Sequence, residues 1–170
     1  MKQTVTRIEF GVERGEGCSC RTCRRNCMYL PGFLIPADLE RMIPEGEDPL
    51  KWAEVNLEAS PGAIVKKDGE TFRIPTLVMA SKGDGSCIYF EKRKCLIWET
   101  SPFGCAFFDC RSKDDPEQDR IQHQLSQRGL KAVFDAWRTD SLYKRVWYHL
   151  MESGHESEPP EDKRARMLES

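Results

Sequence analysis

The chain has 170 residues, of which 39% are hydrophobic and 32% are charged, so it is about one domain long and carries enough apolar side chains for a core. Its 26 basic and 28 acidic residues are interspersed and give a net charge of −2, which excludes a general attraction to nucleic acid or to an anionic membrane. Because no apolar stretch suits a signal peptide or a membrane span, we expect a soluble, cytoplasmic protein.

The first third of the chain predicts short elements. Alternating apolar and polar residues predict a strand over residues 3–12. Pro36 suits the first turn of a helix, and the residues that follow it predict a helix over 36–43. Residues 52–59 have a helix-forming composition, but the segment is too short for periodicity to decide its structure.

The next part of the chain predicts β-structure. The runs 63–66 and 71–79 flank an Asp-Gly pair, which predicts a β-hairpin. Pro75 cannot donate a backbone hydrogen bond, so we expect its strand to lie at the edge of a sheet. Two further short strands are expected at 88–90 and 96–98.

The last third of the chain predicts helices and a tail. Apolar residues recur three or four apart over 118–151, as an amphipathic helix requires. We expect Gly129 and the polar residues 139–141 to divide this segment into two or three helices. Residues 152–170 have almost no apolar side chain to bury, which predicts a flexible charged tail.

Eight cysteines are the main chemical signal. The first group is dense and consists of Cys18, Cys20, Cys23 and Cys27. A tight turn between Cys20 and Cys23 aims two sulfurs at one ion, and one helical turn adds the sulfur of Cys27. The second group is more widely spaced and consists of Cys87, Cys95, Cys105 and Cys110.

The cysteines predict a metal site more strongly than disulfides, because a cytoplasmic protein keeps its thiols reduced. Sulfur ligands favour zinc or an iron–sulfur cluster over magnesium or calcium, and eight thiols suffice for two Cys₄ zinc sites or for one cluster with spare thiols. Two interpretations remain open for Arg21, Arg24 and Arg25: they lower the pKa of the nearby thiols, or they form a solvated basic patch.

The cysteines and their neighbours resemble the YkgJ-type cysteine-cluster family, which is described as a zinc- or iron-chelating domain. The resemblance runs from about residue 18 to residue 110, and it includes the segment 34–41 and the apolar residues after Cys87 and Cys95. The chain departs from the family at Asn26, where the family usually has a cysteine, and at Ser101, where it usually has an arginine. The resemblance implies metal chelation by the cysteines, and it supplies no substrate.

Together these observations predict an α+β protein with an irregular, cysteine-rich, metal-centred core of short strands, followed by C-terminal helices. We expect a cysteine-cluster domain over 1–116, a helical extension packed on it over 117–151, and a tail over 152–170. The expected function is chelation of zinc or an iron–sulfur cluster. The alternatives are an iron–sulfur redox or maturation enzyme and a metal-delivery protein. The sequence assigns no catalytic residue and no protein partner, and nucleic acid is not the expected partner.

Overall fold

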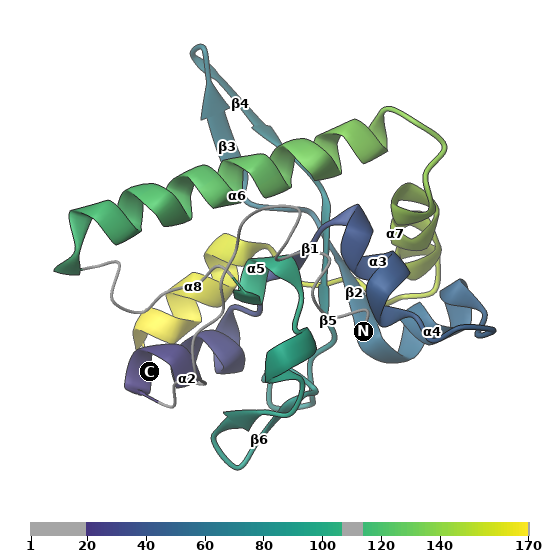
Figure 1. The fold of residues 1–170 in the computed structure, drawn as a ribbon, viewed down its shortest axis with the longest axis horizontal. Helices are drawn as coiled ribbons and strands as arrows, with labels where there is room; N and C mark the ends of the chain where they lie inside the picture. Colours follow the sequence, from purple (N-terminus) through teal and green to yellow (C-terminus); the bar gives the residue numbers. More distant parts are fainter. Residues whose placement is uncertain (1–19, 107–113, 170) are drawn as a thin grey trace.

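The protein is an α+β structure of helices and short antiparallel strands (Figure 1). The computed structural model describes residues 20–106 and 114–169. In these residues, the helices in chain order are α2 (Arg21–Tyr29), α3 (Pro36–Met42), α4 (Pro49–Asn56), the 3₁₀ helix η2 (Trp98–Thr100), α5 (Phe103–Ala106), α6 (Pro116–Trp137), α7 (Leu142–Glu152) and α8 (Pro160–Glu169). None of these helices has the length and apolar character needed to cross a membrane.

A small antiparallel sheet lies at the centre and has the strand order β1 (Phe33–Leu34), β5 (Thr76–Met79), β2 (Leu57–Ser60). All four residues of β5 are buried, because the strand is paired on both sides and covered on both faces. In register, Leu77 of β5 lies opposite Leu34 of β1 and Ala59 of β2. The middle strand is therefore buried along its whole length, as expected for a strand without an exposed side.

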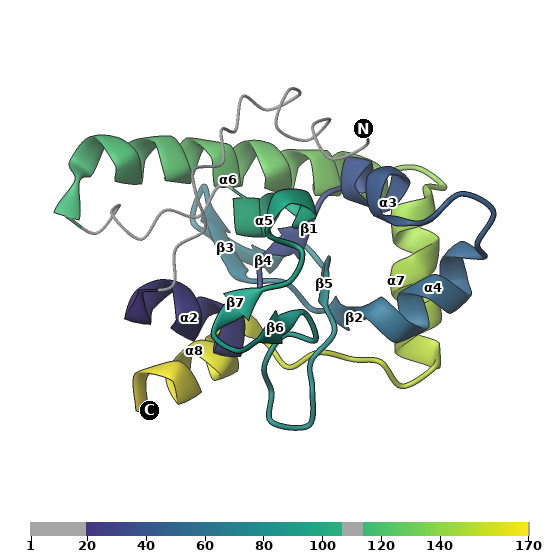
Figure 2. The ribbon, with the colours of Figure 1, turned by 60° about the horizontal axis from the view of Figure 1, so that its bottom comes forward.

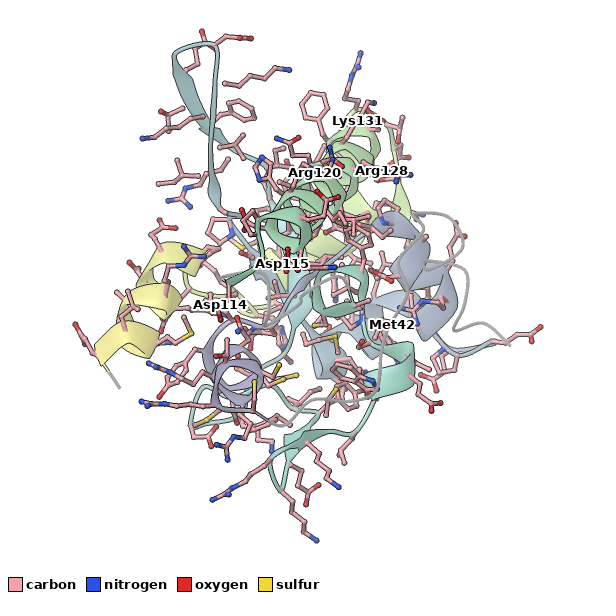
Figure 3. All side chains as sticks on the ribbon, turned by 60° about the vertical axis from the view of Figure 1, so that its left-hand side comes forward. Met42, Asp114, Asp115, Arg120, Arg128 and Lys131 are labelled. Carbon is pink, nitrogen blue, oxygen red and sulfur yellow. The ribbon has the colours of Figure 1, made fainter. Side chains whose placement is uncertain are left out.

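The long helices begin at side-chain caps and pack on this sheet. Asp48, Asp115 and Ser141 each accept hydrogen bonds from backbone N–H groups in the first turns of α4, α6 and α7, which satisfies donors that have no partner inside the helix. Helix α7 contacts β2, β5 and α4, and α6 contacts α3, α5 and α7. The charged side of α6 points outward, and Figure 3 labels three of its exposed residues, Arg120, Arg128 and Lys131.

Tyr143 is the largest fully buried side chain, and it joins α7 to the sheet. Its hydroxyl donates to the carbonyl oxygen of Leu34 at 2.6 Å and accepts from the backbone N–H of Leu77 at 2.8 Å. The surrounding core combines residues of the strands with residues of α3, α6 and α7. The core of the described residues is thus mainly aliphatic and aromatic, and Cys87 is the cysteine that belongs to it.

A buried ion pair connects α3 with the segment that leads into α5. Asp38 Oδ1 accepts from Arg41 Nη2 at 2.8 Å, and Asp38 Oδ2 accepts from the backbone N–H groups of Ile35 and Phe103, each at 2.9 Å. Arg41 also donates to the carbonyl oxygens of residues 100 and 101 at 2.6 and 3.0 Å. Because Arg41 and Asp38 bond to backbone groups of residues 100, 101 and 103, this pair fixes the path of the chain before Cys105.

Two hairpins extend from this body. The predicted hairpin forms from β3 (Ile64–Lys67) and β4 (Glu70–Arg73) with Asp68 and Gly69 in the turn. Our expectation of an edge strand at Pro75 was wrong, because the chain leaves the hairpin at Pro75 and continues as β5 in the middle of the sheet. The second hairpin consists of β6 (Phe90–Glu91) and β7 (Lys94–Cys95), so the expected strands at 88–90 and 96–98 are displaced toward each other.

The remaining segments for which the sequence analysis considered a helix or a strand had different outcomes. The helix predicted over 36–43 is confirmed as α3, and the undecided segment 52–59 divides into the end of α4 and most of β2. Gly129 does not interrupt α6, although 139–141 do separate α6 from α7. A Cβ atom at Gly129 would lie 2.2 Å from Cε1 of the buried Phe103 ring, so this glycine permits close packing. The strand expected over 3–12 lies outside the described residues.

The segment 152–170 differs from the expected flexible tail. Before α8 begins, the chain runs beside β2, where the backbone N–H of Ala59 donates to the carbonyl oxygen of His155 and the N–H of Ser157 donates to that of Ala59. Helix α8 then lies beside α2 (Figures 1 and 2). Polar contacts hold it there, including a hydrogen bond from Arg25 to the carbonyl oxygen of Met167.

Candidate metal centre

The first cysteine group lies at and within helix α2. Cys20 is the N-cap residue, and its sulfur accepts a hydrogen bond from the backbone N–H of Cys23 at 3.4 Å. Cys23 and Cys27 are four residues apart in the helix and therefore share one face. The predicted helical turn between these two cysteines is confirmed. Cys20 is exposed, whereas Cys23 and Cys27 are half-buried.

The second cysteine group is distributed over three different elements. Cys87 is buried in the segment before β6, Cys95 is the last residue of β7, and Cys105 belongs to α5. The Cys105 sulfur accepts a hydrogen bond from the backbone N–H of Gly32 at 3.2 Å. A Cβ atom at Gly32 would lie 2.1 Å from the backbone of Gly104, so the turn before β1 and helix α5 touch backbone to backbone. Cys105 is therefore tightly positioned.

The two groups meet through the backbone of Cys87. Its N–H donates to the carbonyl oxygen of Cys27 at 3.0 Å, which places the end of α2 beside the start of the second group. Cys87 and Cys95 are also close enough for their charges to interact. The fold thus brings together cysteines that are far apart in the sequence.

A complete ligand set is not formed within the described residues. In residues 20–106 and 114–169, no group of three or more His, Cys, Asp or Glu side chains has an arrangement that suits a metal ion. Two of the predicted ligands, Cys18 and Cys110, lie outside the described residues. The prediction that the eight cysteines share one or two metal sites therefore stays a prediction.

The surroundings of Cys87 favour the protonated thiol. Burial raises the pKa of Cys87 above its ordinary value, and the neighbouring Cys95 adds to this shift. A hydrogen bond from the Tyr89 backbone and the charge of Lys82 act in the opposite direction without reversing it. Because metal ligation requires a thiolate, binding at Cys87 is coupled to loss of a proton.

The aromatic side chains near the second cysteine group are mainly part of the core. Phe103 is fully buried and makes an edge-to-face contact with Phe33, with 5.9 Å between the ring centroids. Tyr89 and Phe90, which flank the path from Cys87 to Cys95, are partly buried and pack against the core. The Tyr89 hydroxyl donates to the side-chain oxygen of Asn56. These rings therefore pack in or against the same apolar core that contains Cys87.

Sequence reasoning missed a buried cation in this region. Lys163 of α8 is only 7% exposed, although lysine is seldom buried without a partner. Burial lowers its pKa, and the charges of Glu58, Glu158 and Cys87 oppose that shift. One feature of the sequence could have predicted helix α8, since Pro160 followed by two acidic residues is typical of a helix N-terminus.

Comparisons of the chain with protein-family models, with curated proteins and with solved structures found no match. The resemblance to the YkgJ-type family therefore stays a prediction.

Proposed function

We propose that this chain is a cytoplasmic metal-binding protein whose cysteine thiolates hold zinc or an iron–sulfur cluster. The observation that carries the proposal is the hydrogen bond from the Cys87 backbone to the Cys27 carbonyl oxygen. It joins the two cysteine groups at one place in the fold, beside a half-buried thiol on α2 and a second thiol on β7.

The type of metal follows from the donor atoms. All candidate ligands are cysteines, and thiolate sulfur is the preferred donor for zinc and for iron–sulfur clusters. Metal binding deprotonates the thiols and is coupled to folding, so the ligand set closes when the ion binds. The metal therefore acts first as a structural link between α2, the β6–β7 hairpin and α5.

Metal delivery is a second candidate function, and the exposure of α2 favours it. Cys20 is exposed, and no residue of this helix is buried. A metal held by these thiols would be accessible to an incoming ligand, whereas an enclosed structural zinc site would not. A redox or maturation enzyme is the alternative that applies if the protein carries an iron–sulfur cluster.

The first experiment is elemental analysis together with an absorption spectrum, on protein purified without oxygen. Zinc without colour supports a structural or delivery site, and rapid loss of zinc to a chelator without unfolding selects delivery. Iron with sulfide and a broad band near roughly 400 nm supports a cluster. Protein that folds and carries neither metal contradicts the proposal.

The variant Cys87→Ser tests the observation directly, and Ala80→Ser is its matched control. Both positions are almost equally buried, at 8% and 9% exposure, and the Ala80 carbonyl accepts the backbone N–H of Ile88, next to Cys87. Each variant introduces one hydroxyl at a buried position, but only Cys87→Ser removes a thiol. We expect Cys87→Ser alone to lose metal, and full metal content in this variant would exclude Cys87 as a ligand.

A further inference from the structure

The chain contains two hairpins with turns of the same geometry and different composition. Each has a two-residue turn in which both residues have positive φ, as in type I′ turns. In the β3–β4 turn these are Asp68 at 53° and Gly69 at 80°, and in the β6–β7 turn they are Lys92 at 48° and Arg93 at 67°. Asp-Gly is among the pairs preferred in such turns. Lys-Arg is not, because the Cβ atoms of lysine and arginine crowd the backbone when φ is positive.

The β6–β7 turn therefore keeps two residues that its backbone disfavours. A strained backbone that persists in a fold points to a function for the side chains that occupy it. At this turn the side chains are cations, and Lys94 adds a third directly after them. All three side chains are exposed, and none of these side chains forms a hydrogen bond or ion pair within the part of the chain that the structure describes. They stabilise no other part of the described fold.

Further positive charge lies beside this turn. Residues 20–30 contain three arginines and no acidic residue, and the hydrogen bond from Cys87 to Cys27 holds the end of α2 near the base of the hairpin. Figure 2 shows α2 and the β6–β7 hairpin on the same side of the molecule. Lys82 donates to the carbonyl oxygen of Phe90 in β6. Residues 20–30 and 92–94 thus carry six cations and no acidic residue, in a chain whose net charge is −2.

We propose that the tip of the β6–β7 hairpin is a docking surface for an acidic segment of a partner protein. Three free cations on a protruding turn match a cluster of carboxylates, and such charge complementarity mainly sets specificity and association rate. Leu96 follows the hairpin and is 61% exposed, which supplies an apolar contact beside the charges. Cys95 lies within the same hairpin, so a docked partner is placed next to the candidate metal centre.

An acidic polypeptide fits this surface better than nucleic acid does. Nucleic-acid binding draws its affinity from many phosphate contacts along an extended basic surface, whereas the tip offers three cations on one narrow turn. The proposal does not depend on metal binding, because none of these cations is a candidate ligand.

The test is binding of a fluorescein-labelled poly-glutamate peptide, measured by anisotropy with the full chain. The variant Lys92→Asn/Arg93→Gly installs a preferred type I′ pair and removes both cations. We expect it to weaken peptide binding roughly fivefold or more and to raise Tm by about 2 to 4 °C, because the turn is no longer strained. A gain in stability combined with a loss of binding cannot result from misfolding.

The matched control is Lys66→Gln/Lys67→Gln, which removes two exposed cations from the other hairpin. We expect this control to bind the peptide like the wild type, and binding to weaken as salt rises from about 0.02 M to about 0.2 M. Absence of wild-type binding, or an equal loss in both variants, overturns the proposal. Tighter binding of a single-stranded oligonucleotide or of anionic vesicles than of the peptide overturns the assignment to an acidic polypeptide.

Discussion

Replacing Asp38 by Asn isolates the contribution of the buried ion pair. Both backbone N–H groups that Asp38 accepts are bonded to Oδ2, and Arg41 is bonded to Oδ1. An asparagine whose carbonyl oxygen takes the place of Oδ2 keeps both backbone hydrogen bonds. Its NH₂ group then faces the Arg41 guanidinium, so two donors meet and the buried cation loses its counter-charge.

The expected cost is large because neither partner has access to water. The side chains of Arg41 and Asp38 are 3% and 0% exposed, and removing one partner of such a buried pair costs about 3–5 kcal/mol. With a urea m-value of about 2 kcal/mol/M, the unfolding midpoint is expected to fall by about 2 M. This is a large share of the stability of an ordinary domain, which is about 5–15 kcal/mol.

Urea titration followed by tryptophan fluorescence measures this effect. The control is Asp135→Asn, the same substitution in the exposed pair of Asp135 with Lys131, whose side chains are 51% and 74% exposed. It is expected to cost about 0.5 kcal/mol or less. The double variant Asp38→Asn/Arg41→Met removes the facing donors and is expected to cost less than the sum of its single variants. If Asp38→Asn shifts the midpoint no more than Asp135→Asn does, the reasoning is refuted.

Two further predictions concern the packing of α6 and α7. Gly129→Ala is expected to destabilise the fold by about 1–3 kcal/mol, because its Cβ would overlap the Phe103 ring, whereas Gly83→Ala, with open space around it, is expected to be neutral in the same urea titration. Burial raises the pKa of Tyr143 above its ordinary value, so its stabilising effect is complete below about pH 10 and is lost as the pH rises further. Tyr143→Phe is expected to be less stable than the wild type at neutral pH, since two backbone groups lose their hydrogen-bond partner. It is also expected to lose less stability than the wild type does as the pH rises above about 10. An equal loss of stability at alkaline pH in both proteins would contradict this.

The elements that sequence reasoning predicted well are those whose signal is local. Pro36 marks the start of α3, and the Asp-Gly turn marks the β3–β4 hairpin, because both residues act on their own backbone. Gly129 was misread because its role depends on Phe103, which is distant in sequence. A glycine inside a helical pattern has the same local signature whether it breaks the helix or allows close packing.

Helix α8 was missed for a related reason. Its composition gives little apolar area to bury, so the sequence predicted a tail. The structure holds it through polar contacts with remote residues, including an ion pair between Arg73 and Glu161 and the bond from Arg25 to the carbonyl of Met167. Composition reports how much apolar surface a segment has, but it does not report which charged partners the fold places opposite that segment.

In the candidate site, too, the sequence predicted the local features and did not predict those that depend on the fold. The spacing of Cys23 and Cys27 predicted their helical turn, because four residues in a helix bring two side chains onto one face. The meeting of Cys87 with Cys27 and the burial of Lys163 depend on how α2, β6 and α8 are arranged. No spacing within either cysteine group contains that information.

The hydrogen bonds beside Ala59 have a consequence for solubility. Strand β2 is the outer strand of the sheet, and such a strand offers unpaired N–H and C=O groups to the strands of other molecules. Residues 155–157 occupy part of that edge, since the N–H and the C=O of Ala59 are both bonded to the returning chain. Residues 155–157 thereby protect part of this edge from intermolecular β-sheet growth, and shortening the chain before residue 155 would expose the backbone groups of Ala59 as a template for aggregation.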